Sequence, residues 1–221
     1  MRAAATASRS KRATIAAGSA PLERTVAVVN PTIFFAQSLK DGLVARGIAI
    51  NGEAADLDDI AGSLAATAER RTIVETKSPS LGDIGTVLMK VSQNLYAETL
   101  VKAIGASRGG LGTFEGGLTG VRGALATWGV PGDGYVIADG SGLSRYNYVA
   151  PAALGLVLTA MARHPSFTAF YDALPIAGVD GTIERRLTGT AAHGNVHAKT
   201  GSISNARTLS GYVTTADGER L

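Results

Sequence analysis

Apolar residues recur at helical spacing over five stretches of this chain, and most of these stretches have a recognisable first or last residue. Asn30-Pro31 marks one start, because asparagine accepts hydrogen bonds from the free amides of the first turn and proline fits the first helical position. Gly47 marks the end of that helix, because glycine readily adopts a left-handed conformation. The spacing predicts helices over residues 31–47, 81–91, 95–104, 114–128 and 151–163.

Alternation of apolar and polar residues, together with turn residues, predicts strands between and after these helices. Residues 194–203 and 207–216 alternate like the two strands of an antiparallel hairpin. The whole stretch 48–79 is expected to form short strands and turns. The other predicted strands cover residues 24–29, 71–76 and 135–138.

Composition and charge exclude several classes of protein. The 221 residues are 45% hydrophobic and 18% charged, which is typical of a globular chain and not of a disordered one. The absence of cysteine excludes disulfides and cysteine-based metal sites. No apolar run reaches transmembrane length. The formal charge is only +3, without a dense basic patch or aromatic platforms, which argues against nucleic-acid binding.

Two short motifs carry the candidate chemistry. Lys199-Thr200-Gly201 lies on the first strand of the predicted hairpin, and Ser92-Gln93-Asn94 lies where the predicted helix 81–91 ends. These are two of the three signatures of enzymes that acylate a serine with penicillin or with a peptidoglycan stem peptide. Their order, and their positions at a helix end and on a strand, make the pair more informative than either tripeptide alone.

Residues of both motifs suit acyl transfer to a serine. The Lys199 ammonium and the Thr200 hydroxyl can hold the terminal carboxylate of a substrate. The Asn94 amide can hold the peptide carbonyl of the substrate, and the Ser92 hydroxyl can relay a proton to the leaving amine. We therefore select three catalytic candidates: Ser92, Asn94 and Lys199.

Three strand residues are candidates for substrate binding. Gly201 lets a substrate lie beside the strand without a side chain in the way. The backbone N–H of Ser202 can donate to a developing oxyanion. The predicted substrate-binding residues are Thr200, Gly201 and Ser202.

The residues around these motifs resemble the low-molecular-mass class C penicillin-binding proteins, which form the D-alanyl-D-alanine carboxypeptidase/endopeptidase family. The resemblance covers essentially residues 20–221, with matching segments at Leu88–Glu98, Asp139–Asn147, Leu174–Gly181 and Ala198–Ile203. It implies an α/β (α+β) fold of the penicillin-binding, transpeptidase-like type. In this fold helices flank an antiparallel sheet beside a helical lobe, and we expect this chain to contain it incompletely.

The resemblance implies a serine-type D-alanyl-D-alanine carboxypeptidase or endopeptidase. A serine attacks the penultimate D-Ala carbonyl, D-Ala leaves, and water hydrolyses the acyl enzyme, while β-lactams acylate the same serine. The implied partners are the D-Ala-D-Ala end of peptidoglycan stem peptides and β-lactams, with no cofactor, no metal and no nucleic acid. The implied location is periplasmic or otherwise extracytoplasmic, with peripheral cell-wall or membrane association and an export signal upstream of this chain.

The third signature, Ser-x-x-Lys, lacks a convincing context here. Ser8-Arg9-Ser10-Lys11 matches it literally, but this pair lies in a basic tail, whereas a nucleophile should begin a buried helix. In the family the motif lies far upstream, so we interpret Ser8 and Lys11 as a chance match. We expect residues 1–29 to be the remnant of an inserted accessory domain and residues 30–221 to be a truncated penicillin-binding domain. This chain alone is expected to be inactive.

Two other functions stay open on the residues alone. A class A β-lactamase-like hydrolase shares all three motifs, although no glutamate-bearing loop between Ser92 and Lys199 stands out as a deacylating base. A non-catalytic peptidoglycan-binding fragment or scaffold would keep Asn94 and the lysine motif but lack the nucleophile.

Structural roles compete with several assignments. Ser92 and Asn94 could cap the following helix. His193 and His197 would share one face of a strand, but no third ligand stands nearby, so we assign no metal site. We assign to turns beside the site Asp139, Ser141, Asp180 and Gly181. Seven large apolar residues are expected in the core, not at a lipid site: Phe34, Phe35, Leu88, Leu95, Leu154, Leu156 and Leu158.

Overall fold

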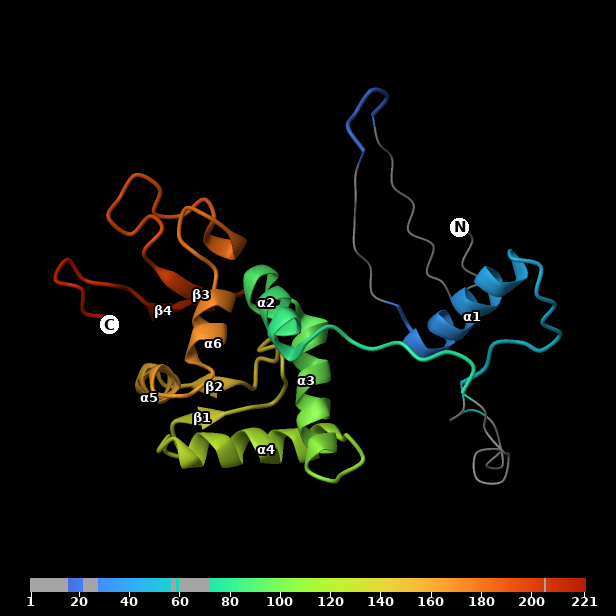
Figure 1. Cartoon of the computed structure of the whole chain (residues 1–221), viewed down its shortest axis with the longest axis horizontal. Coiled ribbons are helices and arrows are strands. Elements are labelled where there is room, and N and C mark those ends of the chain that lie inside the picture. Colours follow the sequence, from blue (N-terminus) through green and yellow to red (C-terminus); the bar gives the residue numbers. More distant parts are fainter. Residues whose placement is uncertain (1–15, 22–27, 57–58, 60–71, 205) are drawn as a thin grey trace. The chain divides into compact units, whose positions relative to one another are not determined.

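A computed structural model describes residues 16–21, 28–56, 59, 72–204 and 206–221 of the chain (Figure 1). The chain forms two compact units, residues 1–74 and residues 75–221. The strand expected at 24–29 lies mostly outside the described residues, as does the Ser8–Lys11 pair. The expected division at residue 29 into an accessory remnant and a penicillin-binding domain stays a prediction.

The described part of the first unit contains one α-helix, α1 (Pro31–Val44). Its start is the predicted one, because Asn30 Oδ1 accepts a hydrogen bond from the Ile33 amide at 3.0 Å and a proline occupies the first helical position. Gly47, with a φ of +84°, follows the last turn. The residues that cap this helix are close to it in sequence, which is why the sequence predicts it.

The strand expected at 71–76 is wrong for residues 72–76. Residues 72–79 have no regular secondary structure, and Ile73 and Val74 are largely exposed. A strand becomes stable when a neighbour completes its hydrogen bonds and covers one face. No described residue forms a β-ladder or a β-bridge with residues 72–76. An apolar, β-branched run therefore suggested a strand that has no partner.

The second unit contains the remaining helices of the described chain (Figure 1). Ser80 begins the first of them as predicted, since its Oγ accepts a hydrogen bond from the Asp83 amide at 3.2 Å. Within the described residues, no helix combines the length and apolar composition needed to cross a bilayer. The bounds are α2 (Leu81–Val91), α3 (Asn94–Ser107), α4 (Phe114–Thr127), α5 (Pro151–Ala162) and α6 (Phe167–Ala173), followed by the 3-10 helix η2 (Gly181–Ile183).

The sequence does not predict α6. Ser166 before it makes no capping hydrogen bond, and its phenylalanine, threonine and tyrosine residues have low intrinsic helix propensity. The helix is held by packing instead, because α6 contacts α2 and its aromatic rings contact Tyr212.

Helices α3 and α4 approach closely at glycines. A Cβ built at Gly105 would lie 2.8 Å from the Thr113 carbonyl oxygen, and one at Gly117 would lie 2.7 Å from Val101 Cγ1. Neither position leaves room for a side chain, because real Cβ contacts are wider than this. The expected helix end at Gly105 is therefore wrong, and α3 continues to Ser107. The glycine permits close packing and does not end the helix.

Two antiparallel two-stranded sheets are present in the described residues: β1 (Tyr135–Val136) pairs with β2 (Tyr148–Val149), and β3 (His197–Ile203) pairs with β4 (Ala206–Tyr212). The predicted hairpin is confirmed, with Lys199 opposite Ser210. The turn at residues 174–180 continues the pairing on the other side of β3, because the Ala198 amide donates to the Pro175 carbonyl at 2.9 Å.

A cluster of buried apolar residues in the second unit lies between this turn, η2 and β3. It consists of Ala177, Ile183 and Ala198, with Val196 packed against them. The expected core is only partly right. Leu88, Leu154 and Leu158 are half-buried, whereas four of the seven residues are exposed: Phe34, Phe35, Leu95 and Leu156. Helical spacing identifies an apolar face, but it does not show whether another element covers that face.

Candidate active site

The serine motif forms the junction between α2 and α3. Ser92 ends α2 with a φ of 57° and a ψ of 54°, a left-handed conformation that costs a non-glycine residue about 1 kcal/mol. Gln93 then caps α3 by accepting a hydrogen bond from the Leu95 amide at 3.4 Å, and Asn94 is the first helical residue. The alternative in which Ser92 and Asn94 cap this helix is wrong, since Gln93 does so.

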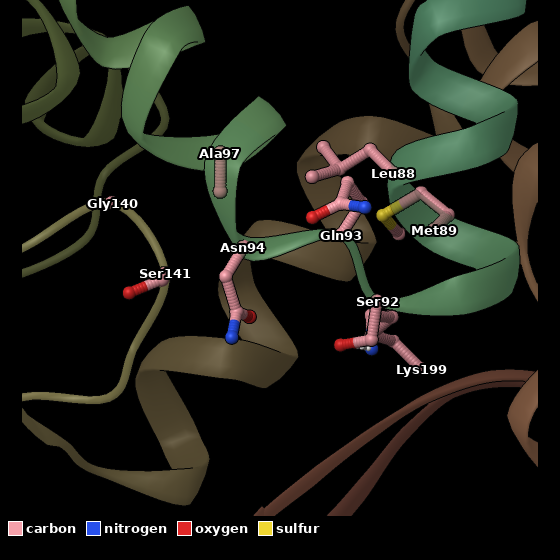
Figure 2. Close-up of a pocket in the computed structure, with 9 residues that line it drawn as sticks. All are labelled: Leu88, Met89, Ser92, Gln93, Asn94, Ala97, Gly140, Ser141 and Lys199. Carbon is pink, nitrogen blue, oxygen red and sulfur yellow. Dashed lines mark hydrogen bonds between the residues drawn. The ribbon is translucent and has the colours of Figure 1, made fainter. Parts of the chain in front are cut away.

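The lysine motif meets the serine motif across the fold. Lys199 Nζ donates to Ser92 Oγ at 2.8 Å and to the Thr200 carbonyl oxygen at 2.8 Å. Figure 2 shows the two side chains together below the α2–α3 junction. Burial lowers the pKa of the Lys199 ammonium, because the charged form loses hydration. A half-buried cation and a hydroxyl are therefore in contact, although 107 positions separate them in the sequence.

A small cavity of about 170 Å³ lies beside this contact. Its walls come from the α2–α3 junction, from the turn after β1 and from β3. The three catalytic candidates Ser92, Asn94 and Lys199 all line it. The complete lining, drawn in Figure 2, is Leu88, Met89, Ser92, Gln93, Asn94, Ala97, Gly140, Ser141 and Lys199.

The three predicted substrate-binding residues lie on β3 but do not line this cavity: Thr200, Gly201 and Ser202. Thr200 follows Lys199 on β3, and its side chain is directed toward η2. Its Oγ1 donates to Thr182 Oγ1 at 2.8 Å. Gly201 lies opposite Thr208, whose side chain occupies the space that a Cβ would need. Substrate binding by the three residues stays a prediction.

The turn after β1 forms the wall on the far side of Asn94 from Ser92 (Figure 2). Asp139 organises this turn, because its carboxylate accepts hydrogen bonds from the Gly142 amide at 2.7 Å and the Ser144 amide at 2.6 Å. The Asn147 side-chain amide donates to the same carboxylate at 2.8 Å. Asp139 therefore holds the turn together, and its neighbours form the wall.

Glu98 fastens this wall to α3, a role that the motifs alone did not indicate. Its Oε2 accepts from the Gly140 amide at 3.1 Å and its Oε1 accepts from the Ser141 amide at 2.9 Å. A Cβ at Gly140 would lie 2.8 Å from the Ala97 carbonyl oxygen, so the turn lies directly on the helix. The spacing of four residues from Asn94 to Glu98 is a usable signal, because such residues share one helix face.

Replacing Glu98 with glutamine should destabilise the second unit by about 2 kcal/mol, the typical worth of hydrogen bonds to a charged group. Glutamine keeps one acceptor oxygen but turns an N–H₂ group toward the other backbone amide. Urea unfolding measures the loss. Glu115→Gln on α4 is the matched control, since Glu115 pairs only at the surface with Arg122. Equal effects of the two substitutions would show that the wall does not depend on Glu98.

The two histidines considered as metal ligands have structural positions. His197 is the first residue of β3, and its ring stacks on Tyr171 with 4.0 Å between the ring centroids. His193 lies in the turn at residues 191–195, just before β3, and its ring lies against Gly178. The two histidines therefore do not share the expected strand face. The described residues contain no group of three or more side chains that could hold a metal ion.

The lowered pKa of Lys199 predicts a pH-dependent stability. The unfolded chain binds a proton on Lys199 up to the ordinary value of 10.5, whereas the folded chain releases it at lower pH. In this window the unfolded state holds more protons, so the free energy of unfolding should rise with pH. Urea unfolding of the wild type and Lys199→Met across the alkaline range isolates the effect. A difference between the two proteins that is constant with pH would contradict it.

Comparisons with known proteins relate the chain to one family. Residues 8–221 match the D-Ala-D-Ala carboxypeptidase 3 (S13) family. The chain is 36% identical over 208 residues to a D-alanyl-D-alanine carboxypeptidase of Actinomadura sp. (strain R39), covering 92% of this chain and 38% of that protein. It is 37% identical over 147 residues to the D-alanyl-D-alanine carboxypeptidase DacB of Haemophilus influenzae, covering 65% of this chain and 31% of that protein.

A solved structure shows the same fold. Penicillin binding protein 4 (dacB) from Haemophilus influenzae, complexed with a novel β-lactam, matches with a TM-score of 0.70 at 30% identity, over 88% of this chain and 44% of that chain. The match confirms the expected fold class of helices with antiparallel strands. The chain thus spans less than half the length of each of these relatives. It belongs to the D-Ala-D-Ala carboxypeptidase 3 (S13) family, the family that its two motifs and their flanking segments predicted.

Proposed function

We propose that this chain supplies part of the active site of a serine-type D-alanyl-D-alanine carboxypeptidase or endopeptidase. The observation that carries the proposal is the 2.8 Å contact between Lys199 Nζ and Ser92 Oγ beside a cavity that Asn94 also lines. An ammonium that binds an anion, a hydroxyl that passes a proton and an amide that holds a carbonyl are the groups that cleavage of a C-terminal D-Ala requires.

The proposed substrate is the D-Ala-D-Ala end of a peptidoglycan stem peptide. Lys199 and Thr200 donate hydrogen bonds to its terminal carboxylate, and the Asn94 side chain donates to a peptide carbonyl. In this arrangement Thr200 gives up its hydrogen bond to Thr182. The peptide lies beside β3 at Gly201 once the Thr208 side chain, which now occupies the space of a Cβ there, turns away, and the Ser202 N–H donates to the oxyanion.

The proposed reaction is acyl transfer. A serine Oγ attacks the penultimate D-Ala carbonyl carbon, the C–N bond breaks, and Ser92 relays the proton that the attacking hydroxyl releases to the departing amine. Water then hydrolyses the ester, which releases the shortened peptide and regenerates the serine. β-Lactams acylate the same serine, and the proposed location is periplasmic or extracytoplasmic. Because the named relatives are D-alanyl-D-alanine carboxypeptidases, they favour this reaction over that of a class A β-lactamase.

The attacking serine is the group that the described site does not identify. None of the residues that line the cavity belongs to a Ser-x-x-Lys motif. The single such motif of the sequence, Ser8 to Lys11, lies outside the described residues. We therefore propose that this chain binds the substrate but does not turn it over by itself.

Two measurements test the proposal. The isotope-labelled chain is titrated, with NMR detection, with a stem peptide ending in D-Ala-D-Ala and with the same peptide amidated at its C-terminus. Saturable shifts at Asn94, Ser141 and Lys199 are expected with the free acid and not with the amide. Intact mass after incubation with benzylpenicillin should show no adduct.

The outcomes separate the alternatives. No shift at the cavity residues with the free acid would contradict the proposed function. Binding without an adduct supports a substrate-binding part of the site. One adduct per chain that disappears in Ser8→Ala would make the chain a self-contained enzyme and overturn the assignment of Ser8 as a chance match. Steady hydrolysis of benzylpenicillin would favour the β-lactamase alternative.

A further inference from the structure

A second lysine lies close to the site and has no role in the chemistry proposed above. Lys90 belongs to the last turn of α2, two positions before Ser92. Its Nζ donates to Asp180 Oδ2 at 2.7 Å and to the Leu174 carbonyl oxygen at 2.6 Å. The Lys90 side chain is 17% exposed, whereas the side chain of Arg122, the cation of the surface ion pair on α4, is 44% exposed. Lys90 therefore points into the structure, where it ties two segments together.

The partner of Lys90 lies in the turn that precedes η2. Asp180 uses its other oxygen, Oδ1, to accept from the Ile176 amide at 2.8 Å. One carboxylate thus closes the turn and holds the lysine at the same time. Leu174 and Pro175, at the start of this turn, are fully buried. The turn is a well-packed element and not a loose loop.

This turn is also bonded to the strand that carries Lys199. Pro175 accepts from the Ala198 amide at 2.9 Å, and Ile176 forms a β-bridge with His197. Ala198 is the residue directly before Lys199. The backbone of the turn therefore sets the position of β3 at the point where the strand enters the site.

The turn rests directly on the end of α2. Gly181 has a φ of +61°, and a Cβ there would lie 2.8 Å from the Lys90 carbonyl oxygen and 2.9 Å from Pro175 Cβ. Only glycine allows the chain to pass so close at this dihedral angle. Helix α2 also packs against η2 and α6, which flank the turn. The ion pair and the close approach at Gly181 both hold the turn against the end of α2.

We propose that the Lys90–Asp180 pair is a positioning device that holds Ser92, at the end of α2, at contact distance from Lys199 on β3. Lys90 fixes the position of Ser92, which lies two residues later in the chain. Asp180 fixes the position of β3, because its turn is hydrogen-bonded to the Ala198 amide. The inference deepens the proposed function, on which it rests, because it names the residues that align the proton-relaying hydroxyl with the cation. Lys90 and Asp180 act on the three catalytic candidates only through the backbone segments that they fix, so they are positioning residues.

The test uses the whole chain and needs no ligand. The side-chain NMR signal of Lys199 is followed through a pH titration in the wild type, Lys90→Met, Asp180→Asn and Lys90→Arg. Arg122→Met is the matched control, because it breaks an ion pair of the same unit far from the turn in sequence. Hydrogen exchange at the Ala198 amide reports on the bond between the turn and β3. Peptide binding is measured separately, so failure of the proposed function and failure of this inference are distinguishable.

In Lys90→Met we expect Lys199 to titrate at higher pH than in the wild type, because a displaced strand exposes the ammonium to water. We also expect the Ala198 amide to exchange at least about tenfold faster, as local opening becomes easier. Lys90→Arg keeps the charge and should retain the wild-type titration. Arg122→Met should change neither quantity.

A folded Lys90→Met protein in which Lys199 titrates as in the wild type would overturn the inference. If Lys90→Met does not fold, Asp180→Asn decides, because asparagine keeps an oxygen for the Ile176 amide and removes only the charge. An Asp180→Asn protein with faster Ala198 exchange but an unchanged Lys199 titration would show that the pair only stabilises the turn. That outcome would also overturn the positioning role.

Discussion

Replacing Lys199 with methionine should weaken binding of a peptide that ends in a free carboxylate by about 100-fold, the equivalent of about 3 kcal/mol for a lost charged hydrogen bond. Methionine keeps most of the side-chain length but removes the ammonium, which now donates to Ser92 Oγ and would donate to the carboxylate. Calorimetric titration with a D-Ala-D-Ala peptide measures the change. Lys102→Met, an exposed lysine on α3, is the matched control and should bind like the wild type.

The same titration with the C-terminally amidated peptide separates charge recognition from general loss of structure. The amide should bind weakly to both the wild type and Lys199→Met, because it carries no charge for the lysine to recognise. An unchanged affinity of Lys199→Met for the free acid would place the carboxylate elsewhere on the surface. Equal losses for acid and amide would indicate a distorted cavity and not a lost ion contact.

Replacing Gly117 with alanine should destabilise the second unit by about 3 kcal/mol, which corresponds to a fall in Tm of about 10 °C. The new methyl group would lie 2.6 Å from the Val101 carbonyl carbon and 2.7 Å from Val101 Cγ1, and still closer to the carbonyl oxygen. Because the blocking atoms belong partly to the backbone, α3 and α4 must move apart to accommodate it. Thermal unfolding followed by circular dichroism measures the effect.

Gly123→Ala in the same helix is the control for this substitution. Nothing lies within 4 Å of a Cβ at Gly123, so alanine should fit and raise stability by about 0.5 kcal/mol through its better helix propensity. A Gly117→Ala protein as stable as the wild type would show that the two helices do not pack as closely as the structure has them.

The helix starts of this chain could be predicted because their signals are local. Asn30 and Ser80 each accept a hydrogen bond from an amide three residues ahead, and a proline opens α5. The α6 helix has no such signal, since Ser166 makes no capping bond and the helix depends on contacts with α2 and Tyr212. A local pattern cannot report on a contact that the rest of the fold supplies.

Burial was less predictable than secondary structure. Phe35 and Leu95 lie at apolar positions of their helices, but they are 70% and 68% exposed. Gly105 looked like a helix end, but it is the point where α4 touches α3. In both cases the residue type limits what can happen at the position, and the neighbouring element decides what does happen.

The sequence by itself determined the family and the chemical groups that the site can use, because the motifs around Ser92 and Lys199 are short and their residue types are visible without the fold. Only the tertiary structure decided which of these groups meet. Glu98 holds a turn 42 positions away, Lys90 holds Asp180 across 90 positions, and Lys199 reaches Ser92 across 107. Packing of the whole second unit supplies the free energy for such contacts, and no local run of residues encodes it.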